Sequence, residues 1–544
     1  MQKKSLAGVL RCASTLLLVA VVTACGNSGL PMAGVPGAPT PPGPNPAPLP
    51  PGPVSCPVAG DLAAAAELAA GLLPEQAKLR EWQEAMVNLG PRFTGSPAHK
   101  AWHEIMVREL EVAGLEIVRE PIPLEWWDHQ KYTLKLIQNG VETAVPVASY
   151  YPYSGSTPPG GIVAELADAG LGLPADMAAA NVGGKIAFYE EDMLPLTAAL
   201  FFATASYVHD PDRTLTPATS YRRASVSFLT PQETTSLTTA SALGAVGAVV
   251  SYDASYDNAV GQYTPFLTDP AASQGVPTLY VDRATGDLIK AKIAEGASAR
   301  LELVVEKHPD AETDDIIATL PGMSDETIIV NTHSDGTSAA QENGTLGVMA
   351  LARYFAALPK TCRQKTMIFT LNPGHFHSGI GGDTQRFIDN HPEIMEQAVA
   401  SLTIEHLGQP EWVDDVTGFH PTGLVEPGAF FGSANAMQLL MTNAVLAEDL
   451  RRTFVIRPYG VIYFGVGSPL NARGVPNAAY ITGPNMMLSF GNNQHLDKID
   501  YERMAAEIRT LTRVAAAMDA TDRAVLCAGL PTGQTGGTTG CTPP

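Results

Sequence analysis

The sequence predicts an α/β fold with a mostly parallel or mixed sheet, helices on both faces, and a small inserted β-rich α+β domain. Two observations support this prediction. From residue 311 onward, short apolar runs alternate regularly with segments of helical periodicity, which is typical of a sheet covered by helices. Between residues 146 and 310 the apolar runs are shorter and are separated by Gly, Pro and Thr, which indicates a separate domain.

Residues 59–145 and 311–526 form the predicted main domain. Helical periodicity predicts a helix over 61–90, and a second helix should begin at Ser96-Pro97 and end at Gly114, because proline favours the first helical position. Alternation predicts a strand over 115–122. The later half is expected to contain strands at 326–333, 365–371, 400–408 and 475–482, and helices at 343–358, 383–399 and 497–519.

Residues 1–25 have the pattern of an export signal. Lys3 and Lys4 give a positive start, an apolar run follows over 15–22, and small residues precede Cys25. A run of this length is too short to span a bilayer and is typical of a processed signal. The pattern resembles that of bacterial lipoproteins, which implies that Cys25 becomes the lipid-modified N-terminus of an exported protein held at the cell envelope. The alternative is an ordinary secretory signal with a cysteine there by chance.

Residues 26–58 are rich in Pro, Gly and Ala and carry no charge, a composition that cannot bury a core. We expect a tether between the lipid and the folded domains. Beyond it, Cys56, Cys362, Cys527 and Cys541 allow up to two disulfides in an oxidising compartment. Because Cys527 and Cys541 bracket a Gly/Thr-rich stretch of the predicted C-terminal tail, residues 527–544, they are the favoured pair.

The formal net charge of −21 argues against a nucleic-acid partner and against electrostatic binding to anionic lipid. Membrane attachment is therefore expected through the lipid anchor only. An aromatic group could line a substrate pocket, but packing between the two domains is the favoured role; its members are Trp126, Trp127, Tyr150, Tyr151 and Tyr153.

Polar side chains recur where the predicted strands of the main domain end. In sheets of this kind, ligands bind beyond the carboxyl ends of the strands. A single histidine there is typically a surface or capping residue, but the same residue types follow three consecutive strands, and they are the ligand types of zinc and related divalent ions. The candidates are His333, Asp335, Glu342, His375, His377, Glu405, His406 and His495.

Five motifs resemble those of the M28 zinc aminopeptidases in order and approximate spacing: VNTHSDG, ENGTLGVMALARYF, GHFHSGIGG, TIEHLG and DKID. Residues 146–310 resemble the protease-associated domain that is found inserted in exported peptidases. The resemblance covers most of residues 76–525. It implies an aminopeptidase fold, one or two divalent ions, most simply zinc, and a peptide or small amide as substrate.

Carried over residue by residue, the resemblance implies that His333 is a metal ligand and that Asp335 orients its imidazole. Glu342 and Glu405 stand where the family has aspartate ligands, and His377 stands at another ligand position. The family's general-base glutamate is replaced by Phe376, so His375 or His377 is the candidate proton acceptor.

The last ligand of the family falls near Phe490, which cannot bind metal. His495, five residues on, could serve only if the loop shifts. The metal site is therefore predicted to be divergent.

Two functions remain open. The first is an envelope-anchored metal-dependent hydrolase acting on peptide or amide bonds with an altered metal site. The second is an inactive relative that uses the cleft or the inserted domain for binding, which the loss of the general-base glutamate favours. A serine hydrolase is not expected, because no G-x-S-x-G motif lies at a strand-to-helix turn.

Overall fold

The computed structural model describes residues 56–191, 193–225, 232–263, 275–458, 463–530 and 538–542. The predicted export signal, Cys25 and nearly all of the tether lie outside these residues. Within the described part of the chain, no helix is both long and apolar enough to cross a membrane.

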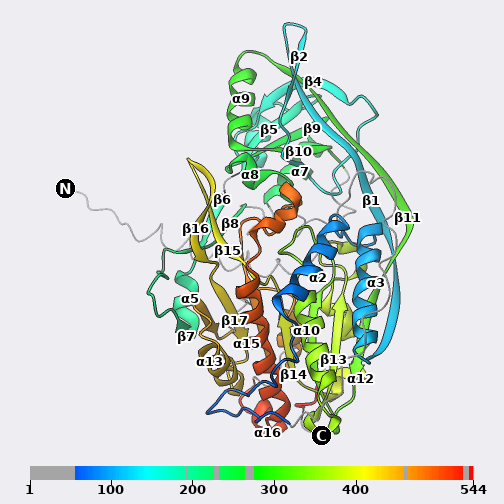
Figure 1. The fold of residues 1–544 in the computed structure, drawn as a ribbon. Coiled ribbons are helices and arrows are strands. Elements are labelled where there is room, and N and C mark those ends of the chain that lie inside the picture. The colour runs from blue at the N-terminus through cyan, green and yellow to red at the C-terminus, as the bar shows by residue number, and fades with distance from the viewer. Residues whose placement is uncertain are drawn as a thin grey trace, which may run out of the picture.

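A mixed sheet with helices on both faces forms the main body, which confirms the predicted fold class (Figure 1). Strands β12, β13, β14 and β19 are parallel to one another. The strand order across this body is β11 (Ser298–Leu320), β13 (Lys365–Asn372), β12 (Ser324–His333), β14 (Ala398–Ile404), β19 (Asn477–Thr482), β17 (Gly428–Gly432), β18 (Thr453–Ile456) and β7 (Ala205–His209).

Successive side chains of the central strands point to opposite faces of the sheet and pack into two separate cores. Ile328 and Val330 of β12 lie in the larger core, whereas Ile329 between them lies in the core on the opposite face. The helices of the larger core are α2 (Gln76–Asn88), α3 (Pro97–Val112), α10 (Gly344–Ala357), α13 (Ala436–Ala447), α15 (Tyr501–Ala520) and α16 (Arg523–Cys527). The opposite core is covered by α11 (Thr384–Asn390), α12 (Pro392–Gln397) and α14 (Ser468–Arg473).

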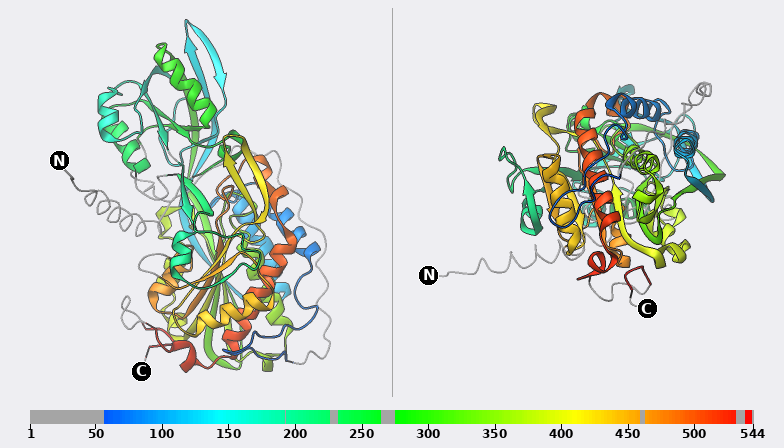
Figure 2. Two further views of the ribbon diagram at one scale, coloured as in Figure 1. Left: turned by 90° about the vertical axis from the view of Figure 1, so that its left-hand side faces the viewer. Right: turned by 60° about the horizontal axis from the view of Figure 1, so that its bottom comes forward.

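Two long antiparallel strands, β1 (Glu116–Gln138) and β11, run from the main body into a second body (Figures 1 and 2). The second body continues the same sheet, which has 15 strands within the described residues. Its strands are β2 (Val141–Val145), β3 (Ser149–Tyr150), β4 (Ile162–Asp168), β5 (Ile186–Glu191), β9 (Gly247–Tyr252) and β10 (Thr278–Val281). Its helices are α4 (Pro174–Ala179), α7 (Gln232–Ala242), α8 (Tyr256–Ala259) and α9 (Arg283–Ala294).

The predicted domain boundaries do not coincide with breaks in this sheet. Strand β11 passes through residue 310 without interruption. Strand β7 lies inside the segment 146–310 but pairs with β18 at the far edge of the main body. The remaining elements are α5 (Ala199–Thr204), the hairpin strands β6 (Met193–Thr197) and β8 (Ser220–Ser225), the pair β15 (Pro410–Asp415) and β16 (Gly418–Val425), and the short helices η1 (Lys360–Cys362), η2 (Ser378–Ile380) and η3 (Asn492–Lys498).

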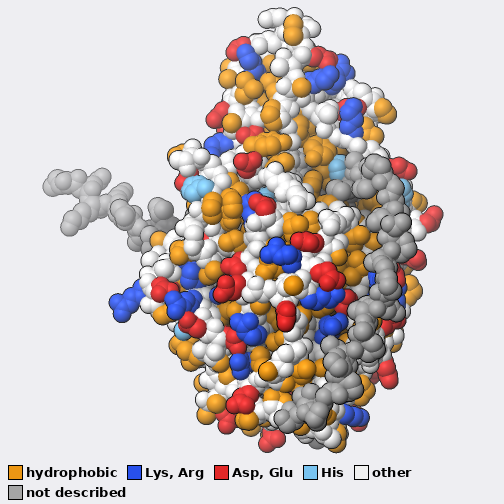
Figure 3. Space-filling view, in the orientation of Figure 1, with side chains coloured by type: hydrophobic (Ala, Val, Ile, Leu, Met, Phe, Trp, Pro, Cys, Tyr) orange, Lys and Arg blue, Asp and Glu red, His pale blue; other side chains and the backbone are white. Residues whose placement is uncertain are grey.

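The two bodies share a core. Trp127, Tyr150 and Tyr153 of the aromatic group are buried there against Phe93 and Phe376 of the main body. The favoured role, packing between the bodies, is thus confirmed for these three residues. On the face seen in Figure 3, acidic and basic side chains are interspersed over the main body and do not gather into patches of one sign.

Two disulfides close the chain, Cys56–Cys362 and Cys527–Cys541, and the second is the predicted pair. Cys362 ends η1, immediately before β13 begins. The first segment of the described chain and α16 both lie at the end of the main body that faces away from the second body (Figure 1). The disulfides therefore sit at the amino ends of the central strands.

Candidate metal centre

The carboxyl ends of the parallel strands bring together side chains that are far apart in the sequence. Strand β12 ends at His333, which is paired in register with Asn372 at the end of β13, and β14 ends just before Glu405. Ligands of open α/β sheets bind at this edge. The site residues predicted from the sequence are therefore expected at this edge.

His333 is fully buried, and its two ring nitrogens have different environments. Nδ1 lies 2.7 Å from the backbone oxygen of Asp335, so Nδ1–H donates to that carbonyl and the lone pair of the neutral ring lies on Nε2. Nε2 has no hydrogen-bond partner among the described residues and lies 3.9 Å from Oε2 of Glu405. Burial lowers the pKa of His333 to about 3, which keeps the imidazole neutral near pH 7.

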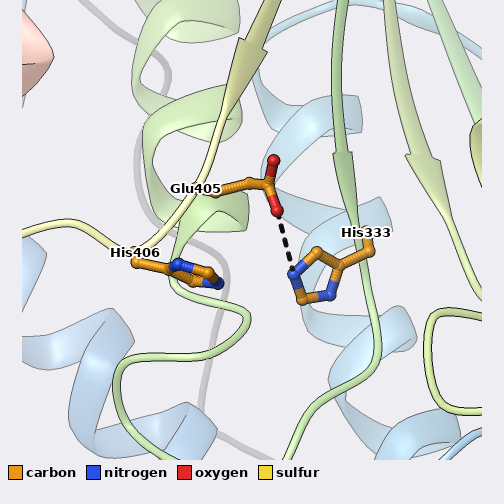
Figure 4. A group of neighbouring side chains, drawn as sticks. All are labelled: His333, Glu405 and His406. Carbon is orange, nitrogen blue, oxygen red and sulfur yellow. Dashed lines mark ion pairs between the residues drawn. The ribbon is translucent and has the colours of Figure 1, made fainter. Parts of the chain in front are cut away.

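Glu405 follows β14 and points toward His333 (Figure 4). Its Oε1 accepts a hydrogen bond from the backbone N–H of Val466 at 2.8 Å, which leaves Oε2 toward the imidazole. Burial raises the pKa of this carboxyl to about 7. A buried carboxylate of this kind is stabilised by a nearby cation.

His406 comes next in the chain and completes the group. Successive residues of an extended strand point to opposite faces, but His406 has a φ of 55°, in the left-handed region, so the backbone turns at this residue. Nδ1–H of His406 donates to the carbonyl of Thr482 at 2.8 Å, and Thr482 Oγ1 donates to the His406 carbonyl at 2.6 Å. These two bonds hold the imidazole beside Glu405 (Figure 4).

The group fits a divalent metal ion. One ligand atom from each of His333, Glu405 and His406 lies within 4.8 Å of the other two, and all three residues are buried. Two imidazoles and one carboxylate form a common set of protein ligands for catalytic zinc, which keeps a further position open. The buried Nε2 of His333, which has no hydrogen-bond partner among the described residues, would use its lone pair to coordinate a metal ion at this place.

Glu342 lies outside this group. Its Oε1 forms an ion pair with Nε of Arg92, and both side chains are completely buried. Burial raises the pKa of Glu342 to about 7, and the adjacent guanidinium opposes that rise. The structure therefore gives Glu342 a cation from the protein itself.

His377 also lies apart from His333. Its Nε2–H donates to the carbonyl of Glu125 at 2.9 Å, and its Nδ1 accepts from the N–H of Gly379 at 3.2 Å. The ring meets Tyr153 edge-on, with 5.8 Å between centroids. Both nitrogens are therefore engaged away from the group.

Asp335 holds a loop. Its Oδ2 accepts from the backbone N–H groups of Gly374 and Phe376 at 3.1 and 3.0 Å, and its Oδ1 accepts from that of His375 at 3.3 Å. The carboxylate lies 3.9 Å from Nδ1 of His333, whose hydrogen bond goes to the backbone oxygen instead. Asp335 therefore positions the loop that carries His375.

His375 lies against the group. Its ring stacks on that of His333 with 4.3 Å between centroids, and its Nδ1 is 3.1 Å from Oδ2 of Asp383. Burial lowers the pKa of His375, but the hydrogen bond to Asp383 and the negative charges of Asp383, Asp335 and Glu405 together raise that pKa above its ordinary value. Asp383 is held in turn as the N-cap of α11.

Neither candidate for the last predicted ligand position, Phe490 or His495, joins the metal group. Phe490 packs against Phe93 and Tyr150, each at 6.1 Å between ring centroids. His495 lies in η3, where its Nε2 is 2.9 Å from Oγ of Ser489. Neither residue belongs to the group of His333, Glu405 and His406.

Three functional candidates were not predicted from sequence: His406 as a ligand, Asp383 and Arg92. His406 was among the strand-end residues, but the family resemblance placed no ligand at this position. Asp383 carried a usable signal, because an aspartate before a helix is a typical N-cap. Arg92 carried none, since a buried ion pair depends on tertiary contacts.

Solved structures with this architecture include aminopeptidases and a peptidase M28 precursor. The zinc aminopeptidase BSAP of Bacillus subtilis aligns with a TM-score of 0.56 and 15% identity, over 83% of this chain and 98% of its own. The chain has the M28 aminopeptidase fold. A peptidase M28 precursor from Shewanella amazonensis SB2B aligns with a TM-score of 0.58 and 18% identity, over 82% and 96%.

An aminopeptidase from Aneurinibacillus sp. strain AM-1 aligns with a TM-score of 0.53 and 15% identity, over 81% and 93% of the two chains. No protein-family model matches the sequence, and no curated protein does. The likeness therefore concerns the fold, and the site has to be judged from its own residues.

Proposed function

We propose that this protein is an exported metal-dependent hydrolase of the M28 type, which cleaves peptide or small amide bonds with an altered metal site. One observation carries the proposal: His333, Glu405 and His406 converge at the carboxyl edge of an aminopeptidase-type sheet, and the buried Nε2 of His333 has no hydrogen-bond partner among the described residues. A buried polar atom without a partner is costly, and metal coordination removes that cost.

Zinc held by these three side chains would polarise a substrate carbonyl and lower the pKa of a bound water. The protein residues prepare that site. The carbonyls of Asp335 and Thr482 fix the tautomers of His333 and His406, so that each ring presents Nε2. Val466 fixes one oxygen of Glu405 and leaves the other for the metal.

His375 is the proposed proton acceptor. The hydrogen bond from His375 to Asp383 and the stacking on His333 reproduce the arrangement of a base and the group that orients it. The ring is only partly buried, which gives it access to a water at the site. Asp383 then stabilises the imidazolium that forms when His375 takes a proton.

One observation favours the second candidate, a binding protein without turnover. Phe376, at the position where the resemblance places the general base, is fully buried in the shared core. The two functions differ in the role of His375. Replacing His375 by Ala should abolish turnover while leaving metal content unchanged if the hydrolase proposal is right.

Export and lipid attachment at Cys25 are part of the proposal. The two disulfides support it, because such bonds persist in oxidising compartments. The parallel strands and helices of the second body are compatible with a protease-associated domain. Labelling with a fatty acid should modify the full chain, and a Cys25→Ser variant should take up no label.

The decisive experiment is elemental analysis of the chain from Cys56 onward, after incubation with zinc and removal of the excess. Bound zinc that is lost in a His333→Ala variant supports the metal centre and justifies a screen of aminopeptide and amide substrates. Absence of bound metal, with no thermal stabilisation by added zinc, would refute the hydrolase and leave the binding protein.

A further inference from the structure

Glu342 and Arg92 form a buried ion pair against the loop that follows His333. Glu342 lies in the loop between β12 and α10, and Arg92 lies in the segment between α2 and α3. Neither side chain has any exposed surface. A carboxylate in such a place needs a positive partner, and an arginine side chain stays charged at every accessible pH.

The guanidinium is fixed by oxygen atoms on several sides. Besides the carboxylate of Glu342, its Nη1 donates to the carbonyl of Gly90 and to Oε1 of Gln494, and its Nη2 donates to the carbonyl of Ser338 at 3.0 Å. Gln494 is itself held through its Nε2, which donates to the carbonyl of Val87 at 2.9 Å. Four oxygens from three segments of the chain thus surround one cation.

The backbone around the pair leaves no extra room. Arg92 and Gly336 exchange backbone hydrogen bonds at 2.9 and 3.0 Å. A Cβ atom at Gly336 would lie 1.9 Å from Oε2 of Glu342, so only glycine lets the carboxylate occupy this place. The ion pair is therefore built into the loop that follows His333.

In the described part of the chain, the other residues at the ligand positions that the resemblance implies for a second ion supply no donor beside Glu342. His377 is turned to the carbonyl of Glu125, His495 is bonded to Ser489, and Phe490 is apolar. A divalent ion beside Glu342 would also lie next to the guanidinium, and the like charges would repel each other at close range in a buried site.

We propose that Arg92 is a resident cation that takes the place of a second metal ion and limits this centre to one. The inference rests on the proposed metal centre at His333, Glu405 and His406. In this inference, Glu342 balances the charge of Arg92 and does not bind metal, and Arg92 holds the carboxylate of Glu342 in place.

Metal counting tests this directly. The chain from Cys56 onward should bind about one equivalent of zinc, and a Glu342→Gln variant should keep that equivalent because Glu342 is not a ligand. Two equivalents in the unchanged protein, or loss of zinc in Glu342→Gln, would overturn the inference while leaving a metal centre in place. No zinc in the unchanged protein would overturn the proposed function and the one-metal limit together.

A double-mutant cycle on thermal unfolding of the metal-free protein tests the pair itself. Arg92→Met should lower the unfolding midpoint strongly, and adding Glu342→Gln should recover part of that loss, because a neutral amide then replaces the unpaired buried carboxylate. Arg452→Met is the matched control, since Arg452 is also buried but pairs with Glu411. Glu342→Gln should not rescue it.

Strictly additive shifts for Arg92→Met and Glu342→Gln would contradict the inference. If Arg92→Met does not fold, Arg92→Lys and Glu342→Gln complete the comparison. Arg92→Lys keeps the charge and should retain one equivalent of zinc, and a second equivalent in this variant would overturn the proposal.

Discussion

The backbone conformation of His406 decides whether this residue can bind metal. A histidine with a φ of 55° is uncommon, and such residues gather at functional sites. Loss of an outer partner of a metal ligand weakens binding roughly 10- to 100-fold, so removing the ligand itself should weaken zinc binding by about 100-fold or more. We therefore expect His406→Ala to lose zinc in a competition with a chelator of known affinity.

His420 provides the control for that measurement. It lies in β16 with an exposed side chain and is not in the metal group. His420→Ala should retain the affinity of the unchanged protein. Equal affinities for the two variants would remove His406 from the ligand set.

A second residue prediction concerns acid stability. His103 is buried with its Nε2 2.9 Å from Oγ of Ser334, and burial lowers its pKa to about 3. In the unfolded chain the same group titrates near pH ~6.5, so the unfolded state binds the proton first as the pH falls. Neutral His103 therefore contributes fully to the free energy of unfolding above about pH 6.5. That contribution declines toward pH 3, by about 1.4 kcal/mol per pH unit.

Urea unfolding between pH 7 and pH 5 measures this contribution. His103→Gln should show a weaker pH dependence than the unchanged protein over this range. Parallel curves for the two proteins would mean that His103 does not stay neutral in the folded state.

The sheet edge that carries the site could be predicted from the sequence better than the residues that form the site. His333 and Glu405 follow apolar strands, so their place at the sheet edge could be predicted from the strands alone. The partners of His377 and Glu342 could not, because the carbonyl of Glu125 and the guanidinium of Arg92 come from distant segments. A buried charge pair leaves no periodic trace in a sequence.

At the scale of the elements, the contribution of the N-cap of α15 to stability can be measured. Asp500 Oδ1 accepts from the backbone N–H groups of Glu502 and Arg503 at 3.0 and 2.9 Å. Replacement of such a cap by alanine typically costs about 1 kcal/mol. Asp500→Ala should lower the free energy of unfolding by that amount in urea titrations.

The nearby Asp497 is an exposed aspartate that does not cap α15, and Asp497→Ala is the control. It should change stability by less than about 0.5 kcal/mol. An equal loss in both variants would show that the cap contributes nothing specific to the stability of α15.

Helices and strands were predictable where a local signal was strong. Ser96 caps α3 by accepting from the N–H of His99, and Gly114 follows the helix with a φ of 85°, as Pro97 and Gly114 had indicated. The helix predicted over 383–399 is instead two helices, because α12 begins at Pro392. The helix predicted over 61–90 begins only at Gln76.

At the scale of the whole molecule, the long strands β1 and β11 decide the architecture. The alternation in 115–122 indicated a strand, but β1 is 23 residues long and includes two prolines. Its length depends on pairing with β11 from a distant part of the chain, which the local pattern does not contain. The predicted boundary at residue 310 came from the change in the length and spacing of the apolar runs, and it falls inside β11.

The two disulfides should contribute unequally to stability. One joins residues 306 apart and the other residues 14 apart. In the chain-entropy model these separations correspond to about 6 and about 3 kcal/mol. We expect Cys56→Ser with Cys362→Ser to lower the unfolding free energy more than Cys527→Ser with Cys541→Ser, in guanidinium titrations under non-reducing conditions. Equal losses would indicate a compact unfolded state.

The Cys56–Cys362 disulfide also determines how the molecule would work on a surface. It fastens the start of the folded chain at the amino end of β13, whereas His333 lies level with the other end of that strand, about 25 Å away. With a lipid on Cys25, the segment 26–55 could span at most about 100 Å. The chain would then be attached to the membrane through the end of the main body opposite to His333, which leaves the metal group on the side away from the attachment point.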